Sequence, residues 1–196
     1  MKTTIICTAV AAALSFGTAA FAMNKADYTA SKDRISAEYK SAKDACSPMK
    51  GNAKDVCQAE AKGTYDVRKK ELEVSYKPTD KNRNDVRLAK AEAAYDVAKE
   101  KCDDQTGNAK DVCVVEAKAV HAKAKANAKL NMEVKEAVSD ANTSTNKANE
   151  KIADARVDAA QTKIDADYKV AKEKCDATSG KAKDDCLSAA KIKFGK

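Results

Sequence analysis

Three pairs of cysteines are the residues of this sequence whose spacing most clearly indicates chemistry. The second cysteine of each pair follows eleven residues after the first, and the pairs are Cys46 and Cys57, Cys102 and Cys113, and Cys175 and Cys186. Paired cysteines can form disulfides, bind metal ions or carry out thiol redox reactions. Structural zinc sites commonly use more closely spaced cysteines or added histidines, and redox enzymes use a C-x-x-C motif. The spacing found here therefore favours structural disulfides over both alternatives.

The N-terminal residues 1–22 have the pattern of a cleavable secretory signal. Lys2 precedes an apolar segment that begins at Ile5, and residues 20–22 form an A-x-A cleavage site. We therefore predict cleavage after Ala22 and export to the periplasm or out of the cell, with no transmembrane segment in the mature chain. Six cysteines remain after cleavage, and an oxidising compartment again favours disulfides over metal-binding thiolates.

Each cysteine pair lies within a longer repeat. The three copies are YKSAKDACSPMKGNAKDVCQAEAK (39–62), YDVAKEKCDDQTGNAKDVCVVEAK (95–118) and YKVAKEKCDATSGKAKDDCLSAAK (168–191). A tyrosine precedes the first cysteine of each copy by seven residues, at Tyr39, Tyr95 and Tyr168. Pro or Gly interrupts the helical pattern between the two cysteines, which indicates two helices joined by a short turn.

Helical spacing places the tyrosine and the first cysteine of each copy on one face of a helix. In the first copy Ile35, Tyr39, Ala42 and Cys46 follow one another at intervals of four, three and four residues. Inward-facing cysteines of a close, alanine-lined helix pair can reach the Cα separation of roughly 4.4–6.8 Å that a disulfide requires. We therefore predict one disulfide per helical hairpin. The tyrosines are predicted to pack against the partner helix rather than to bind a ligand.

The remaining sequence predicts an all-α protein. Trp is absent and aromatic residues make up 5% of the chain, so its Ala-, Lys-, Glu- and Asp-rich helices must meet through narrow contacts rather than around a thick core. We expect helices at about residues 25–45, 53–76, 82–101, 109–138, 146–174 and 181–192. Asn52 and Asn108 are the predicted N-caps of the helices that follow the first two turns. The six helices should form three antiparallel hairpins, in an elongated array or a loose coiled-coil-like bundle.

Helix breaks give the expected division of the chain. Pro78 ends the helix before it, because proline biases the residue before it away from the helical conformation. The predicted segments are the signal (1–22), the first hairpin (23–77), the second hairpin (78–138), a linker or helix break (139–147) and the third hairpin (148–196).

Charged residues of both signs are mixed along nearly every helix. The chain has 37 Lys and Arg against 30 Asp and Glu, a mixture typical of solvated helix faces. The most cationic segment contains Lys118, Lys123, Lys125 and Lys129, which we take as candidate anion-binding residues. No aromatic residue interleaves with them, so specific nucleic-acid binding is not predicted. His121 lies in the same segment, has no counterpart in the repeat copies, and is predicted to be a solvated surface residue.

The sequence contains no motif that indicates catalysis. A phosphate loop, a nucleophile elbow and an HExxH motif are all missing, so we predict neither enzymatic activity nor a cofactor. The leading hypothesis is a structural or protein-interaction role among envelope proteins. The alternative is a binding module for anionic envelope components or metal ions through the Lys-rich faces. A homo-oligomer also stays open.

The signal, the Ala/Lys-rich helices and the YKxAKxxC…GNAKDxC repeat together resemble a group of exported β-proteobacterial proteins. These proteins are often labelled cell-envelope biogenesis or TolA-like proteins, and the resemblance spans nearly the whole chain. It implies a helical periplasmic protein of the cell envelope. TolA proteins combine a membrane anchor, a long Ala/Lys-rich helix and a globular C-terminal domain. The present sequence has a cleavable signal in place of the anchor, so no functional residue of TolA is carried over.

Overall fold

The computed structural model describes residues 23–140 and 145–196. The predicted signal and residues 141–144 of the predicted linker lie outside these described residues. The described residues form α1 (Lys25–Cys46), α2 (Gly51–Tyr76), α3 (Asp80–Cys102), α4 (Gly107–Asp140), α5 (Thr145–Cys175) and α6 (Gly180–Phe194). The predicted all-α class and the six helices are confirmed.

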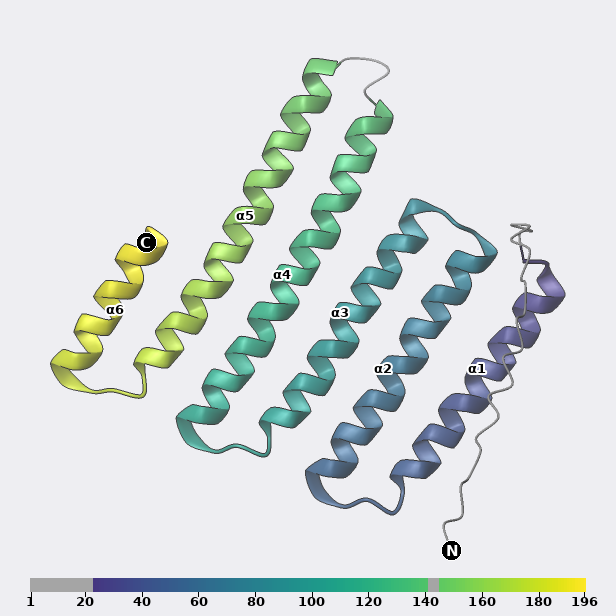
Figure 1. The fold of residues 1–196 in the computed structure, drawn as a ribbon, viewed down its shortest axis with the longest axis horizontal. Helices are drawn as coiled ribbons and strands as arrows, with labels where there is room; N and C mark the ends of the chain where they lie inside the picture. The colour runs from purple at the N-terminus through teal and green to yellow at the C-terminus, as the bar shows by residue number, and fades with distance from the viewer. Residues whose placement is uncertain (1–22, 141–144) are drawn as a thin grey trace, which may run out of the picture.

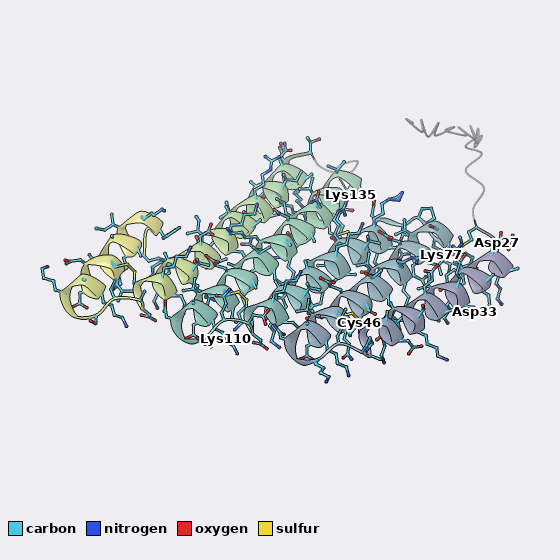
Figure 2. All side chains as sticks on the ribbon, turned by 60° about the horizontal axis from the view of Figure 1, so that its bottom comes forward. Asp27, Asp33, Cys46, Lys77, Lys110 and Lys135 are labelled. Atoms are coloured by element: carbon cyan, nitrogen blue, oxygen red, sulfur yellow. A yellow bond between two sulfur atoms is a disulfide. The ribbon has the colours of Figure 1, made fainter. Side chains whose placement is uncertain are left out.

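The six helices lie side by side in one row, each antiparallel to the next (Figure 1). Within the described residues each helix packs only against the helices that precede and follow it in the chain. The predicted hairpins are α1–α2, α3–α4 and α5–α6, but α2 also packs against α3 and α4 against α5. The row is therefore continuous, and side chains project from both of its faces (Figure 2). The protein is an elongated, single-layer array.

The interior of this array consists of narrow seams between neighbouring helices, which are lined mainly by alanine. The buried alanines are Ala61, Ala91, Ala117, Ala119, Ala126, Ala128, Ala137, Ala148, Ala155, Ala159, Ala166 and Ala190. Small side chains let helix axes approach closely, but each contributes little buried apolar area. Among the described residues the largest fully buried side chains are Cys46, Cys102 and Cys175, each 1% exposed. The seams thus depend strongly on the cysteines.

The turns inside the hairpins differ from the prediction at one point. The helices after the turns begin at Gly51, Gly107 and Gly180, and these glycines have φ of 56°, 58° and 56°. This left-handed conformation is strained for residues with a side chain. The predicted N-caps Asn52 and Asn108 are wrong, because both residues already lie inside the first turn of their helices. The glycine conformation, rather than an asparagine side chain, redirects the chain into each second helix.

The connections at the opposite ends of the helices are short. The Thr79 hydroxyl caps α3 by accepting a hydrogen bond of 3.1 Å from the amide of Asn82, directly after Pro78. Helix α4 continues to Asp140 and α5 starts at Thr145. The two helices therefore occupy most of the predicted linker 139–147, and only residues 141–144 separate them.

Candidate functional site

Three disulfides close the hairpins at one edge of the array, and we call each of them a clasp. They join Cys46 to Cys57, Cys102 to Cys113 and Cys175 to Cys186, with Cα–Cα distances of 5.7, 5.6 and 5.7 Å. Each clasp links the last residue of one helix to an early residue of the next. The three clasped turns lie along the same edge of the row, the lower edge in Figure 1. The predicted pairing is confirmed.

An aromatic pair lies next to each clasp, within the same hairpin. Tyr39 stacks on Tyr65 with ring centroids 4.6 Å apart, and Tyr95 stacks on His121 at 4.9 Å. The third pair is Tyr168 and Phe194, tilted at 6.1 Å. In every hairpin the second ring follows the second cysteine by eight residues. The repeat therefore extends further along each second helix than the copies compared in the sequence.

The position of His121 corrects the sequence prediction of a solvated residue without a counterpart. Its side chain is 16% exposed, and it occupies the position that Tyr65 and Phe194 hold in the other hairpins. Its Nε2 lies 2.9 Å from a Glu92 carboxylate oxygen, without the alignment of a hydrogen bond. The imidazole acts as the second ring of an aromatic pair. Comparing the copies beyond their second cysteines would have revealed this.

We expect the substitution Tyr95→Ala to lower the free energy of unfolding by about 2 kcal/mol, because it removes a ring packed in the seam between α3 and α4. Tyr95→Phe keeps the stacked ring and should change the stability by less than about 0.5 kcal/mol. Denaturant titration followed by circular dichroism measures both values. Equal losses for the two variants would show that the ring contact does not stabilise the hairpin.

Successive hairpins meet in two further contacts, which we call joint 1 (α2–α3) and joint 2 (α4–α5). In joint 1 an ion pair of 3.1 Å connects Glu60 to Lys101. In joint 2 an ion pair of 2.7 Å connects Glu116 to Lys174, the same positions of the repeat. The two joints therefore share their register as well as their antiparallel geometry.

In joint 1 a glycine lets the two helices approach closely. Gly63 is buried in α2, and a Cβ added at this position would lie 2.7 Å from the Cβ of Ala93 in α3. Real side-chain atoms do not approach one another so closely, so Gly63 is required by the helix contact. Glycine destabilises the interior of a helix, but at this position it allows α2 and α3 to pack closely.

The four candidate anion-binding lysines do not form one patch. Lys123 pairs with Asp167 of α5, and Lys129 pairs with Asp158 at 3.3 Å. Lys118 and Lys125 form no ion pair within the described residues, and helical spacing places them with Lys129 on one side of α4. Lys123 projects about 140° away from Lys118. The cationic segment is thus divided between different faces of α4.

The structure limits the chemistry that the cysteines and carboxylates can perform. All six described cysteines are oxidised, so none offers the thiolate that a zinc site or a redox reaction requires. No group of three or more His, Cys, Asp or Glu residues in the described ranges is arranged to hold a metal ion.

Membrane spanning was tested along residues 23–140 and 145–196. None of the helices there combines the length and the apolar character needed to cross a bilayer.

An ion pair connects Lys196, just after the end of α6, to α5. Lys196 donates to the Asp165 carboxylate, which also accepts a hydrogen bond of 2.9 Å from Gln161. These two donors, Lys196 foremost, hold the pKa of Asp165 below its ordinary value of 3.8. A lowered folded-state pKa contributes stability above the unfolded-state pKa, and this contribution is lost as the pH falls through the folded-state pKa.

We therefore expect α6 to loosen as the pH falls below 3.8, and Asp165→Asn to reduce this acid sensitivity. Thermal unfolding between about pH 5 and pH 2.5, followed by circular dichroism, measures the effect. Asp154→Asn, an exposed site on the same helix, is the matched control and should retain the pH dependence of the parent chain. Identical pH profiles for Asp165→Asn and the parent chain would contradict the prediction.

A shallow groove follows joint 1 on one face of the array. Its apolar lining consists of Gly63, Val67, Ala93, Ala94, Val97 and Ala98. The ion pair between Glu60 and Lys101 borders it near the clasped edge, and the pair between Glu71 and Lys90, at 2.7 Å, borders it further along. An apolar floor between charged borders has the pattern of a surface that accepts a helix or an extended segment of a protein.

The fold and its clasps define a class of architecture: a single-layer array of disulfide-clasped helical hairpins. No protein-family model, curated protein sequence or solved structure gives a match to this chain.

Proposed function

We propose that this chain is a non-enzymatic protein with a structural or protein-interaction role in the cell envelope. The observation that carries this proposal is the single row of helices, which leaves both broad faces of the array accessible while the clasps fix its hairpins. Three disulfides are consistent with an extracytoplasmic protein. The predicted signal and the resemblance to exported TolA-like proteins support a place in the periplasm.

The groove along joint 1 is the part of the surface best suited to a protein partner. A row of helices one layer thick has little interior in which to build an enclosed catalytic pocket. Its extended faces instead offer apolar strips between charged borders, and such strips fit the amphipathic helices of other proteins. The proposed function is therefore tested at Ala94, which lines this groove.

Crosslinking in cells tests this role. A photoreactive amino acid at Ala94, which lies exposed in the groove, should yield one discrete envelope protein as its crosslinked partner. The same amino acid at Lys99, exposed on a different face of α3, is the matched control. A partner that crosslinks from Ala94 and not from Lys99 supports the proposal. Identical products from the two positions, or none from either, would contradict it.

Binding to an anionic envelope surface is a second candidate function. It is favoured by Lys118 and Lys169, which border the same groove between α4 and α5 and form no ion pair within the described residues. Vesicles with anionic headgroups should bind the protein at low salt and release it at high salt. Replacing Lys118, Lys125 and Lys169 by Ala should weaken binding more than replacing Lys25, Lys32 and Lys50, a change of equal charge. Equal effects of the two triple variants would show that the site has no specificity.

A further inference from the structure

Among the described helices, the first and the last each pack against one neighbour, so each has one edge that no other described helix covers. The outer edge of α6 is the side that faces away from α5, and the outer edge of α1 is the side that faces away from α2. Ile192 of α6 is 81% exposed, more than the other large apolar side chains that the described residues leave exposed. The repeat shows what the corresponding positions do inside the array.

Ile192 occupies the position of a joint residue. It follows Cys186 by six residues, as Gly63 follows Cys57 and Ala119 follows Cys113. Gly63 is buried in joint 1 against Ala93, and Ala119 is buried in joint 2. In the third hairpin the same position carries a large apolar side chain, which no further helix of the described residues covers.

The outer edge of α1 carries the matching half of a joint. Ala37 precedes Cys46 by nine residues, as Ala93 precedes Cys102 and Ala166 precedes Cys175. Ala93 contacts Gly63 in joint 1, and Ala166 is buried in joint 2. Ala37 has the same small side chain at this position but is exposed, because no hairpin precedes α1 within the described residues.

The polar positions of the two outer edges are also complementary. In joint 2 the Asn108 side chain donates to the Glu173 carbonyl at 3.4 Å. The corresponding residues of the outer edges are Lys181 of α6 and Asp44 of α1, which carry opposite charges. Both are exposed.

Two further pairs of positions match across the outer edges. Lys123 and Asp167, which form an ion pair in joint 2, correspond to Lys196, which follows the end of α6, and to Glu38 of α1. Within one chain Lys196 already pairs with Asp165, and Glu38 pairs with Arg68. Glu116 and Lys174, also paired in joint 2, correspond to Ala189 and Ala45, so both charges are replaced together by alanine. The charges at these positions thus have partners within their own chain, and none is left unpaired when the outer edges meet.

We propose that the outer edge of α6 of one copy of this chain packs against the outer edge of α1 of a second copy, in the antiparallel order of joints 1 and 2 but with the helix axes further apart, because Ile192 is larger than Gly63 and Ala119 at the matching positions. The second copy continues the row, with Ile192 covered by Ala37 of the next chain. Such a contact joins two different surfaces, so it repeats along one direction rather than closing a two-fold dimer. Helix α6 has 15 residues against 26 in α2, so the new joint is shorter than joint 1 and the association is weak and concentration-dependent.

Two single substitutions block the two edges separately. Ile192→Glu places a charge on the edge of α6, and Ala37→Glu places a bulky charged side chain where both joints have alanine. Both sites are exposed in the single chain, so the circular dichroism spectrum and thermal midpoint should match those of the parent protein. Each substitution should raise the concentration needed for association about tenfold or more.

Sedimentation velocity of the oxidised, processed chain up to about 0.5 mM is the test. The parent protein should form species larger than one chain, and each variant alone should remain a single chain. An equimolar mixture of the two variants should form two-chain species, because one intact edge of each kind is still present. Non-reducing mass spectrometry checks that no disulfide joins the chains.

Three results would overturn the proposal. The first is a parent protein that remains a single chain over the whole concentration range. The second is self-association of either variant alone to the extent of the parent, which indicates a contact of an edge with itself. The third is a mixture of the two folded variants that contains no two-chain species.

Discussion

Removing the central clasp is expected to lower the thermal midpoint by roughly 6–12 °C. Cys102→Ser combined with Cys113→Ser opens a loop between residues separated by 11 positions, and closing such a loop contributes about 3 kcal/mol in the entropic description. For a chain of this size each kcal/mol corresponds to roughly 2–4 °C. The effect is large relative to total stability, because the seams around the clasp consist mainly of alanine.

Thermal unfolding by circular dichroism measures this effect, and the terminal clasp provides the comparison. Cys175→Ser combined with Cys186→Ser frees α6, which packs only against α5 within the described residues. We expect this variant to lose the helical signal of α6 early while the main transition moves less than in the central variant. Reduction of the parent protein should exceed both effects. A reduced protein with an unchanged midpoint would refute the stabilising role of the clasps.

Enlarging Gly63 is expected to disrupt joint 1. Gly63→Leu forces a branched side chain into a position where even a Cβ would lie 2.7 Å from the Cβ of Ala93. The two helices must separate, and overpacking of this kind costs about 1–3 kcal/mol or more. Gly63→Ala combines the same clash with a gain in helix propensity of roughly 1 kcal/mol. It should therefore be clearly less destabilising than Gly63→Leu.

A double-mutant cycle isolates the contact. Ala93→Gly alone should cost about 1 kcal/mol in helix propensity. Combined with Gly63→Ala, it removes the atom that clashes, and the double variant should be more stable than the sum of the single effects predicts. Chemical denaturation of the four proteins gives the coupling free energy. A coupling energy near zero would mean that α2 and α3 do not approach at Gly63 as the structure has them.

The cysteine spacing was sufficient to predict the hairpins and their pairing. Cys46 ends a helix on the same face as Tyr39, and its partner Cys57 follows a turn too short to allow any arrangement except an antiparallel one. Local rules of helix periodicity and disulfide geometry decide both features. For the same reason the helix boundaries agree with the structure to within a few residues.

Features that depend on backbone conformation or on contacts between hairpins were not predictable in this way. Asn52 has the residue type of an N-cap, yet the positive φ of Gly51 moves the helix start ahead of it. His121 looked isolated because the aromatic position of the repeat accepts Tyr, His or Phe. The single-layer arrangement depends on which alanine faces meet, and alanine lines several sides of these helices with little preference.

The single row with clasps along one edge has a mechanical consequence. The first and last helices lie at opposite ends of the row (Figure 1), so a force applied between them would peel helices apart one at a time rather than shear a core. Each clasp would prevent the segment between its two cysteines, which are separated by 11 positions, from extending when the chain is pulled. At about 3.3–3.6 Å per residue these 11 positions extend to about 36–40 Å, and subtracting the Cα–Cα distance of 5.7 Å leaves roughly 30–34 Å of hidden length per clasp. Reduction of the disulfides would release it, so the chain would stretch to different limits in oxidising and reducing surroundings.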